Sequence, residues 1–301
     1  MRIVFFGTPD FAVASLQRLV EQHYDIVAVV TAPDKPAGRG MQLQASAVKQ
    51  YALATDLPVL QPEKLKDPAF IETLRQLNAD LFIVIAFRML PEVVWTMPPI
   101  GTFNLHASLL PAYRGAAPIN WAIINGERET GLTTFFLKHE IDTGDILFQT
   151  KVAVPENMTA GELHDVLMHE GAALVVKTVD AIANKNYTLQ NQVGAIKHAP
   201  KLFKEHAKID WAKPTASVYN LIRGLSPYPA AFTYLNDKVF KLYTVVKLLK
   251  PATEAAGTPV TDHKTYLRFA TADGYIDCLE VQLEGKKRMP IKDFLAGYKW
   301  T

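Results

Sequence analysis

The chain has 301 residues, a hydrophobic content of 49% and a formal net charge of +2 at pH 7. A chain of this length is too long to fold around one typical hydrophobic core, so two domains are predicted. The single cysteine, Cys278, excludes an intramolecular disulfide and a cysteine-rich metal site.

Short apolar strands alternate with helices through the first 187 residues. Strands are predicted at residues 2–6, 25–31, 80–87 and 101–106, helices at 9–21, 47–54, 68–77 and 159–183, a polar loop at 32–45, and a hairpin at 130–138 and 145–154. This alternation is typical of an α/β fold whose mostly parallel, Rossmann-like sheet is covered on both faces. The strands that end at Phe6, Ala86 and His106 should open onto one edge, where such sheets bind ligands.

The turn after the first strand departs from the dinucleotide-binding fingerprint. Gly7 follows the strand, but Pro9 and Asp10 stand where further glycines would let the backbone approach a pyrophosphate. We therefore expect no bound NAD. Gly7 serves either a tight strand–helix turn or a substrate contact.

The pattern changes after Tyr187. Residues 188–206 show no clear periodicity, which indicates a linker. A helix is predicted at residues 214–224. Strands are then predicted at residues 230–235, 239–249, 266–270 and 275–283, a spacing typical of an all-β barrel or sandwich. The sequence thus predicts a domain at 1–187, a linker at 188–206 and a second domain at 207–301.

Charge is divided unequally between these parts. Residues 1–187 hold 15 Lys and Arg against 20 Asp and Glu, a net charge of −5, whereas residues 188–301 hold 17 against 10, a net charge of +7. Such asymmetry indicates either a nucleic-acid partner or a solvated, lysine-rich surface.

Other features exclude several classes of protein. No apolar run approaches the ~18–20 residues of a membrane-spanning helix, and the start MRIVFFGTPD lacks a signal-peptide pattern. No histidine or cysteine cluster has metal-ligand spacing. We therefore expect a cytoplasmic protein that binds no metal and has no membrane partner.

The segment 101–118, GTFNLHASLLPAYRGAAP, is the most informative stretch of the chain. Asn104 and His106 are two residues apart on a predicted strand, so their side chains leave the same face. An amide and an imidazole can serve acyl transfer, in which one stabilises an oxyanion and the other handles a proton. Asp142, in the sequence HEIDTGD, could reach His106 from the following hairpin. The alternative is a strand end whose polar residues cap a turn.

The sequences of these segments resemble those of a known family. NLHASLLPAYRGAAPI followed by EIDTGDIL is similar to the signature of formyltransferases that use 10-formyltetrahydrofolate, while FFGTPDFA and DKPAGRG are similar to the branch that formylates initiator methionyl-tRNA. The resemblance implies that Asn104, His106 and Asp142 are catalytic and that the second domain is OB-like. Asp142 would orient the imidazole and favour its protonated form, or accept the proton of the amine through a water.

The resemblance also implies a folate site. The expected folate-binding residues are Ala86, Phe87, Arg88, Leu90, Ser108, Leu109, Leu110, Pro111, His139, Glu140 and Ile141. The segment VIAFRMLP is one residue shorter than the pattern of the family. Arg88 therefore either contacts the folate tail or is solvated, and we favour solvation.

The remaining implication is a site for the acceptor stem of the tRNA. The expected contacts are Lys35 and Arg39 of the DKPAGRG loop, Lys204 of the linker, and Lys286 and Lys287 of the second domain, because basic side chains neutralise phosphates. Arg114 is expected to fix a loop. A monomer is expected. Formylation of a small amine and RNA or folate binding without catalysis are the alternatives.

Overall fold

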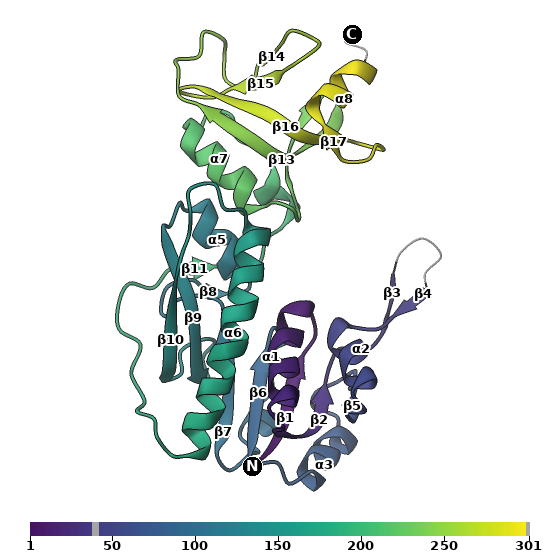
Figure 1. Ribbon diagram of the computed structural model, residues 1–301, viewed down its shortest axis with the longest axis vertical. Coiled ribbons are helices and arrows are strands. Elements are labelled where there is room, and N and C mark those ends of the chain that lie inside the picture. The colour runs from purple at the N-terminus through teal and green to yellow at the C-terminus, as the bar shows by residue number, and fades with distance from the viewer. Residues whose placement is uncertain (38–41, 299–301) are drawn as a thin grey trace. The chain divides into compact units, whose positions relative to one another are not determined.

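The computed structural model describes residues 1–37 and 42–298, and Figure 1 shows its elements. The chain forms two compact units. The N-terminal unit comprises Met1–Arg114, Gly131–Val152 and His164–His198. The C-terminal unit comprises Gly115–Thr130, Ala153–Leu163 and the chain from Ala199 onward. The chain thus passes between the units more than once, so each unit is built from segments that are far apart in sequence.

A seven-stranded sheet forms the centre of the N-terminal unit, in the order β10-β9-β7-β6-β1-β2-β5. Its strands are β1 (Arg2–Gly7), β2 (Asp25–Val30), β5 (Val59–Leu60), β6 (Leu81–Ile85), β7 (Gly101–His106), β9 (Glu129–Phe136) and β10 (Ile146–Ala153). The neighbours from β5 to β7 are parallel, and β9 is antiparallel to β7. The predicted α/β fold with a mostly parallel sheet is confirmed.

The register explains why the candidate residues meet. Gly7 pairs with Ile85, and Ile85 pairs with Leu105. The carboxyl ends of β1, β6 and β7 therefore lie at the same edge of the sheet, as the sequence predicted. At Gly7 an added Cβ would lie 2.7 Å from the Cβ of Ala12, so this turn needs glycine for close packing.

Helices cover both faces of this sheet, which is why its strands read as continuous apolar runs. On one face Phe70 and Leu74 pack with Val4, Phe82 and other buried side chains of the strands. On the other face Figure 1 shows α1 and α6 in front of the strands. The helices that contribute to this unit are α1 (Asp10–Glu21), α2 (Ala47–Ala54), α3 (Pro68–Gln76), α4 (Glu92–Trp95) and α6 (Ala160–Ala183).

Local capping explains two of the predicted helix starts. The side chain of Ser46 accepts a hydrogen bond from the backbone N–H of Lys49 at the start of α2. Asp67 accepts from the N–H of Ala69 at the start of α3, where Pro68 is the first helical residue. Both are typical N-terminal signals, since they satisfy donors that the helix leaves unpaired.

The expectation of an irregular loop at residues 32–45 is wrong in part. Strands β3 (Lys35–Ala37) and β4 (Gln42–Gln44) pair as an antiparallel hairpin. Each strand has only three residues, too few for a two-residue period to appear in the sequence. Between 188 and 206 the structure contains β11 (His198–Ala199), which pairs with β8 (Arg114–Gly115), and the start of the short 3-10 helix η1 (Lys204–Ala207).

The C-terminal unit contains an antiparallel sheet in the order β12-β13-β16-β15-β14, with β17 paired to β16. The elements are β12 (Ala231–Leu235), β13 (Lys238–Leu248), β14 (Pro259–Thr261), β15 (Leu267–Ala270), β16 (Tyr275–Leu283), β17 (Met289–Pro290), α5 (Pro118–Ile124), α7 (Thr215–Gly224) and α8 (Ile291–Gly297). Val218, Phe240 and Phe294 belong to one buried core beneath the sheet. The sheet curls into a half-barrel of the OB-like kind, as expected. Within residues 1–37 and 42–298, no helix has the length and apolar character to cross a membrane.

Candidate active site

The site begins at the end of β7. Asn104 and His106 lie on the same face of this strand, and His106 pairs in register with Thr133 of β9. The imidazole is buried, with 7% of the residue exposed. Its Nε2 lies 2.8 Å from the carbonyl oxygen of Tyr113 in the turn that follows the strand. The turn therefore holds the orientation of the ring.

Asp142 reaches His106 from the loop between β9 and β10, as the sequence predicted. Oδ2 of Asp142 lies 4.0 Å from Nδ1 of His106, and the two side chains are 10% and 8% exposed. Asp142 has a backbone φ of 56°, in the left-handed region, which Asp adopts more readily than most residues. Such a conformation persists only where the surrounding structure holds it, and it is often found at functional sites.

These contacts assign the hydrogens of His106. A carbonyl oxygen only accepts, so Nε2 carries a hydrogen and donates it to Tyr113. Nδ1 is then the nitrogen that exchanges a proton. In the neutral ring Nδ1 accepts a proton, and in the imidazolium it donates toward Asp142 or a substrate. The sequence placed an imidazole here, but only the structure shows which nitrogen is available.

Asn104 carries an unmet hydrogen-bonding requirement. Its Oδ1 is buried and has no hydrogen-bond partner within residues 1–37 and 42–298. A buried acceptor without a donor is costly, and such atoms are uncommon in folded proteins. A substrate N–H placed beside His106 would satisfy it. One carboxamide, one imidazole and one carboxylate together provide hydrogen-bond donors and acceptors that suit the transfer of an acyl group to an amine.

The predicted folate residues of the turn after β7 lie beside this group. Ser108 is fully buried, and its hydroxyl donates to the carbonyl of Ala112 at 2.6 Å. Thr133 donates to the carbonyl of Ser108 at 2.7 Å and accepts from the N–H of Leu110 at 3.1 Å. The hydroxyl of Ser108 is therefore committed to the turn. Leu109, Leu110 and Pro111 form the same turn.

The predicted folate residues after β6 lie at the neighbouring strand end. Ala86 has a φ of 47°, so the chain turns sharply there. Phe87 packs against Phe6 with ring centroids 5.7 Å apart, and Leu90 is buried. Arg88 is not simply solvated, because its guanidinium donates to the carbonyl oxygens of Pro62 and of Glu63. Burial lowers the pKa of Arg88 from its ordinary value.

The third predicted segment, His139, Glu140 and Ile141, lies on the Asp142 loop. Nε2 of His139 lies 3.3 Å from Oε1 of Glu92, and its ring meets that of Trp95 edge-on at 5.5 Å. Ile141 is 64% exposed, although it is apolar. The three predicted folate segments thus all adjoin the strand ends or the Asp142 loop.

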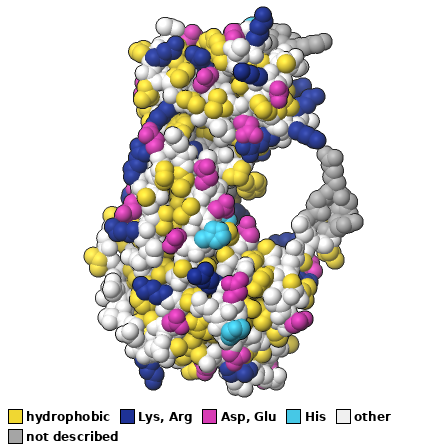
Figure 2. Space-filling view, in the orientation of Figure 1, with side chains coloured by type: hydrophobic (Ala, Val, Ile, Leu, Met, Phe, Trp, Pro, Cys, Tyr) yellow, Lys and Arg dark blue, Asp and Glu magenta, His cyan; other side chains and the backbone are white. Residues whose placement is uncertain are grey.

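The predicted tRNA contacts are far from this group in the sequence, and they belong to several different elements. Lys35 is exposed on β3, and Arg39 lies outside the described residues. Lys204 lies over the ring of Phe232 at 5.9 Å, and Lys286 and Lys287 are exposed between β16 and β17. Figure 2 shows Lys and Arg side chains spread over the visible face of the C-terminal unit.

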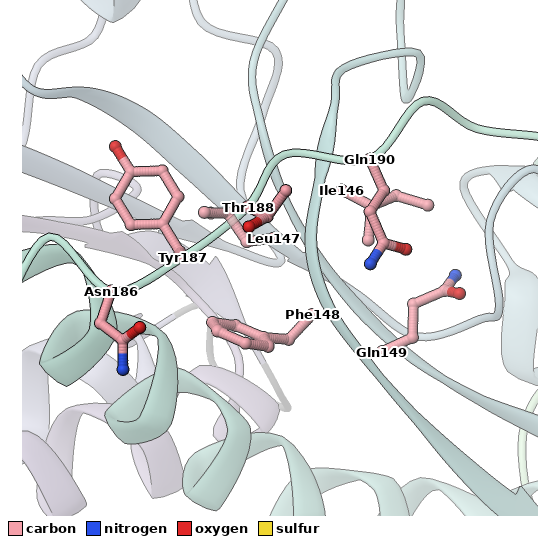
Figure 3. Close-up of a pocket in the computed structure, with 8 residues that line it drawn as sticks. All are labelled: Ile146, Leu147, Phe148, Gln149, Asn186, Tyr187, Thr188 and Gln190. Carbon is pink, nitrogen blue, oxygen red and sulfur yellow. The ribbon is translucent and has the colours of Figure 1, made fainter.

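A pocket of about 470 Å³ lies elsewhere in the N-terminal unit (Figure 3). Figure 3 shows Asn186 and Tyr187 on one side of Phe148, and Gln149 and Gln190 on the other. The lining side chains are uncharged and belong to β10 and the segment after α6. Neither His106 nor Asp142 lines this pocket. The candidate site is therefore identified by its chemistry and not by cavity size.

Sequence reasoning missed Tyr113 and Gln192. Tyr113 contributes only its carbonyl, and a backbone role leaves no signal in the side-chain sequence. Gln192 lies in the predicted linker, and its carboxamide contacts the backbone of Asp142 at 2.8 Å. No group of three or more histidine, cysteine or acidic side chains in the described part of the chain is arranged to hold a metal.

The sequence comparisons identify the family. A family model described as formyl transferase matches residues 1–179, and one described as formyl transferase, C-terminal domain, matches residues 201–299. The methionyl-tRNA formyltransferase of Bacteroides fragilis is 55% identical, with 100% of this chain and 96% of the relative covered. That of Flavobacterium johnsoniae is 52% identical, with 100% of this chain and 97% of the relative covered.

Solved structures share the fold. WlaRD, a sugar 3N-formyl transferase solved with dTDP and 5-N-formyl-THF, has a TM-score of 0.68 at 20% identity over 95% of this chain and 99% of that chain. HypX from Aquifex aeolicus, solved with tetrahydrofolic acid, has a TM-score of 0.68 at 17% identity over 100% of this chain and 48% of that chain. The present chain therefore belongs to the formyl transferase family, in which its full-length relatives are methionyl-tRNA formyltransferases.

Proposed function

We propose that the protein transfers the formyl group of 10-formyltetrahydrofolate to the α-amine of initiator methionyl-tRNA, the step that prepares this tRNA for translation initiation. The observation that carries the proposal is the buried group of Asn104, His106 and Asp142 at the carboxyl edge of the sheet. The family and the names of the full-length relatives support the choice of substrates.

Asn104 orients the amine and stabilises charge. Its unpaired Oδ1 accepts a hydrogen from the attacking amine and so directs the nitrogen lone pair toward the formyl carbon. Its Nδ2 donates to the formyl oxygen, which becomes negative as the carbon becomes tetrahedral. Loss of one such donor typically reduces the rate by about 10²–10³-fold.

His106 and Asp142 manage the proton. The amine must lose a proton as its bond to carbon forms, and Nδ1 of His106 is the imidazole atom that can take it, because Nε2 already donates to Tyr113. The imidazolium then faces the carboxylate of Asp142 at 4.0 Å, and donates from Nδ1 to the oxyanion or to the departing folate nitrogen. No covalent bond to the protein is required.

The two substrates occupy different parts of the chain in this proposal. Folate contacts the strand ends and turns that hold Ala86, Ser108 and His139, with backbone groups of these segments as partners. Arg39 and the lysines of the C-terminal domain contact the acceptor stem, where guanidinium and ammonium groups neutralise phosphates. We assign catalysis to residues 1–187. We assign tRNA binding to residues 207–301 together with Lys35, Arg39 and Lys204, in a monomer that acts in the cytoplasm.

The decisive test is formylation of charged tRNA by the purified full-length chain. Initiator and elongator methionyl-tRNA are each incubated with 10-formyltetrahydrofolate, and formylmethionine is measured after release from the tRNA. We expect rapid formylation of the initiator tRNA and slow formylation of the elongator tRNA, with both reactions slowed by about 10²–10³-fold in Asn104→Ala. Formylation of a small amine but of neither tRNA would overturn the choice of acceptor, and no formyl transfer at all would leave a binding protein.

A further inference from the structure

Gln192 joins two loops that flank His106, although it was expected to lie in a linker. Its Nε2 donates to the carbonyl oxygen of Asp142 at 2.8 Å and to that of Gly144 at 2.9 Å. Its Oε1 accepts from Nε of Arg114 at 3.1 Å and from Nη2 at 2.6 Å. Carbonyls only accept and guanidinium only donates, so these partners determine the orientation of the amide.

The chain around Gln192 is anchored at both ends. Residues 190–198, which we call the strap, begin at a pair of backbone hydrogen bonds between Gln190 and Ile146 and later provide the carbonyl of Lys197 to the N–H of Arg114. Nζ of Lys197 also lies 5.5 Å from the centre of the Tyr113 ring. The strap therefore contacts both the start of β10 and the turn that orients the imidazole.

The strap contacts the site next to two residues whose backbone conformations are energetically unfavourable. Tyr113, which accepts from His106, has a φ of 62°, and Asp142 has a φ of 56°. Left-handed conformations of side-chain-bearing residues persist when neighbouring contacts hold them. Gln192 binds the carbonyl of one of these residues, and Arg114 directly follows the other.

We propose that Gln192 and Arg114 are positioning residues that hold the Asp142 loop against His106. The inference rests on the proposed formyl transfer, because it assigns to the pair the geometry of that reaction. Neither side chain touches the reacting atoms. Without the amide donor, the Asp142 loop leaves its left-handed conformation part of the time. The rate of formylation then falls in proportion to the fraction of molecules in which the loop keeps that conformation.

The sharpest variant is Gln192→Glu. The carboxylate keeps an acceptor for Arg114 but replaces the donor that serves Asp142 and Gly144 with an oxygen, which repels both carbonyls. Gln190→Glu is the matched control, since it makes the same isosteric change and adds the same charge on the same strap, while the backbone bonds of Gln190 to Ile146 remain. Gln192→Ala removes the donor without adding charge.

Two measurements on the full-length chain test the proposal. We expect Gln192→Glu and Gln192→Ala to lower kcat for formylation by about 10- to 100-fold, with KM for the tRNA within about twofold of the parent. Hydrogen exchange of the backbone amides of residues 139–145, measured without substrates, should become faster in both variants at an unchanged Tm. Gln190→Glu should match the parent in both measurements.

The outcomes distinguish the positioning role of Gln192 from the proposed choice of tRNA as the formyl acceptor. Parent-like kcat and parent-like exchange in both Gln192 variants would overturn the positioning role. Faster exchange in a chain whose parent does not formylate tRNA would retain the positioning role and reject the proposed acceptor. A double variant with Arg114→Ala should be no slower than Gln192→Ala alone, because the two residues act as one unit; additive losses would contradict that coupling.

Discussion

The two units of the molecule use polar side chains in opposite ways. In the N-terminal unit, the side chains of His106 and Asp142 are buried, and directed hydrogen bonds hold the two residues: His106 donates to the carbonyl of Tyr113, and the carbonyl of Asp142 accepts from Gln192. In the C-terminal unit, basic side chains lie on the surface over aromatic rings. These pairs are Lys201 with Phe203, Lys204 with Phe232, Lys208 with Tyr234, Lys250 with Tyr275, and Arg288 with Tyr243.

The difference follows from how steeply each interaction depends on distance. Proton transfer and oxyanion stabilisation require donors and acceptors within hydrogen-bond distance, so a shift of about 1 Å is costly. Attraction between lysines and phosphates acts over a Debye length of about 8–10 Å and tolerates mobile side chains. Substitutions should therefore change turnover in the first unit, and affinity with its salt dependence in the second.

Removal of a side chain from the N-terminal site should reduce turnover more than any other substitution considered. Asn104→Ala and His106→Ala should each lower kcat for formylation by about 10²–10³-fold, because each removes a group that stabilises the transition state. Circular dichroism and tRNA affinity should remain close to those of the parent. His169→Ala is the control, since this exposed histidine lies on the same unit. Turnover unchanged in His106→Ala would remove the imidazole from the mechanism.

A second prediction tests whether turnover depends on the close packing of Gly144, in the Asp142 loop, against the backbone of Phe136. At Gly144 an added Cβ would lie 1.6 Å from the carbonyl oxygen of Phe136, so Gly144→Ala must displace the loop. We expect kcat to fall by up to about 10²-fold. At Gly297 in α8 nothing lies within 4 Å of an added Cβ among the described residues. Gly297→Ala should therefore leave turnover unchanged, and equal losses in the two variants would contradict the role of the loop.

A third prediction concerns the charged surface of the C-terminal unit. The combined change Lys204→Ala, Lys286→Ala and Lys287→Ala should raise KM for the tRNA by about tenfold and leave kcat within about twofold. The slope of log affinity against log salt should become shallower by about one for each phosphate that is no longer neutralised. Lys185→Ala removes an exposed lysine of the N-terminal unit and serves as the control. An unchanged salt slope in the triple variant would show that these lysines do not bind phosphates.

The smallest effect concerns a partly buried ion pair in the half-barrel. Nε of Arg268 lies 3.7 Å from Oδ1 of Asp277, and neither atom has a hydrogen-bond partner in the described part of the chain. Burial raises the pKa of Asp277, and Arg268 opposes the rise only in part. Folding thus favours the neutral acid, and this contribution to stability is lost as pH rises through the folded pKa.

Asp277→Asn should therefore raise Tm relative to the parent by about 1–3 °C at neutral pH and by less near pH 3. Asp273→Asn provides a comparison of opposite sign, because hydrogen bonds from the backbone and hydroxyl of Thr215 lower the pKa of Asp273. That variant should lower Tm at neutral pH. Scanning calorimetry across this pH range measures both, and a Tm difference for Asp277→Asn that shrinks as pH rises would contradict the assigned sign.

Sequence pattern was sufficient to predict the α/β class and most of the long helices and strands, and it led to the proposal of Asn104, His106 and Asp142 as the catalytic trio. Apolar runs and helical spacing report burial directly, so the strands β1, β2, β6 and β7 and the long helix α6 were predicted within a few residues. The trio was recognised because Asn104 and His106 share one face of a strand and the surrounding motif resembles a known family. Short elements such as β3, α4 and β17 were not predicted, since two to four residues are too few for a strand or helix period to repeat.

Which atoms of the trio are available depends on contacts that form only in the folded chain. The tautomer of His106 depends on the carbonyl of Tyr113, and the position of Asp142 depends on Gln192, which is fifty residues further along the chain. Such backbone contacts leave no mark on side-chain composition, because any residue carries the same carbonyl. Side-chain pattern therefore predicts which groups can react, whereas the folded backbone determines how they are oriented and held.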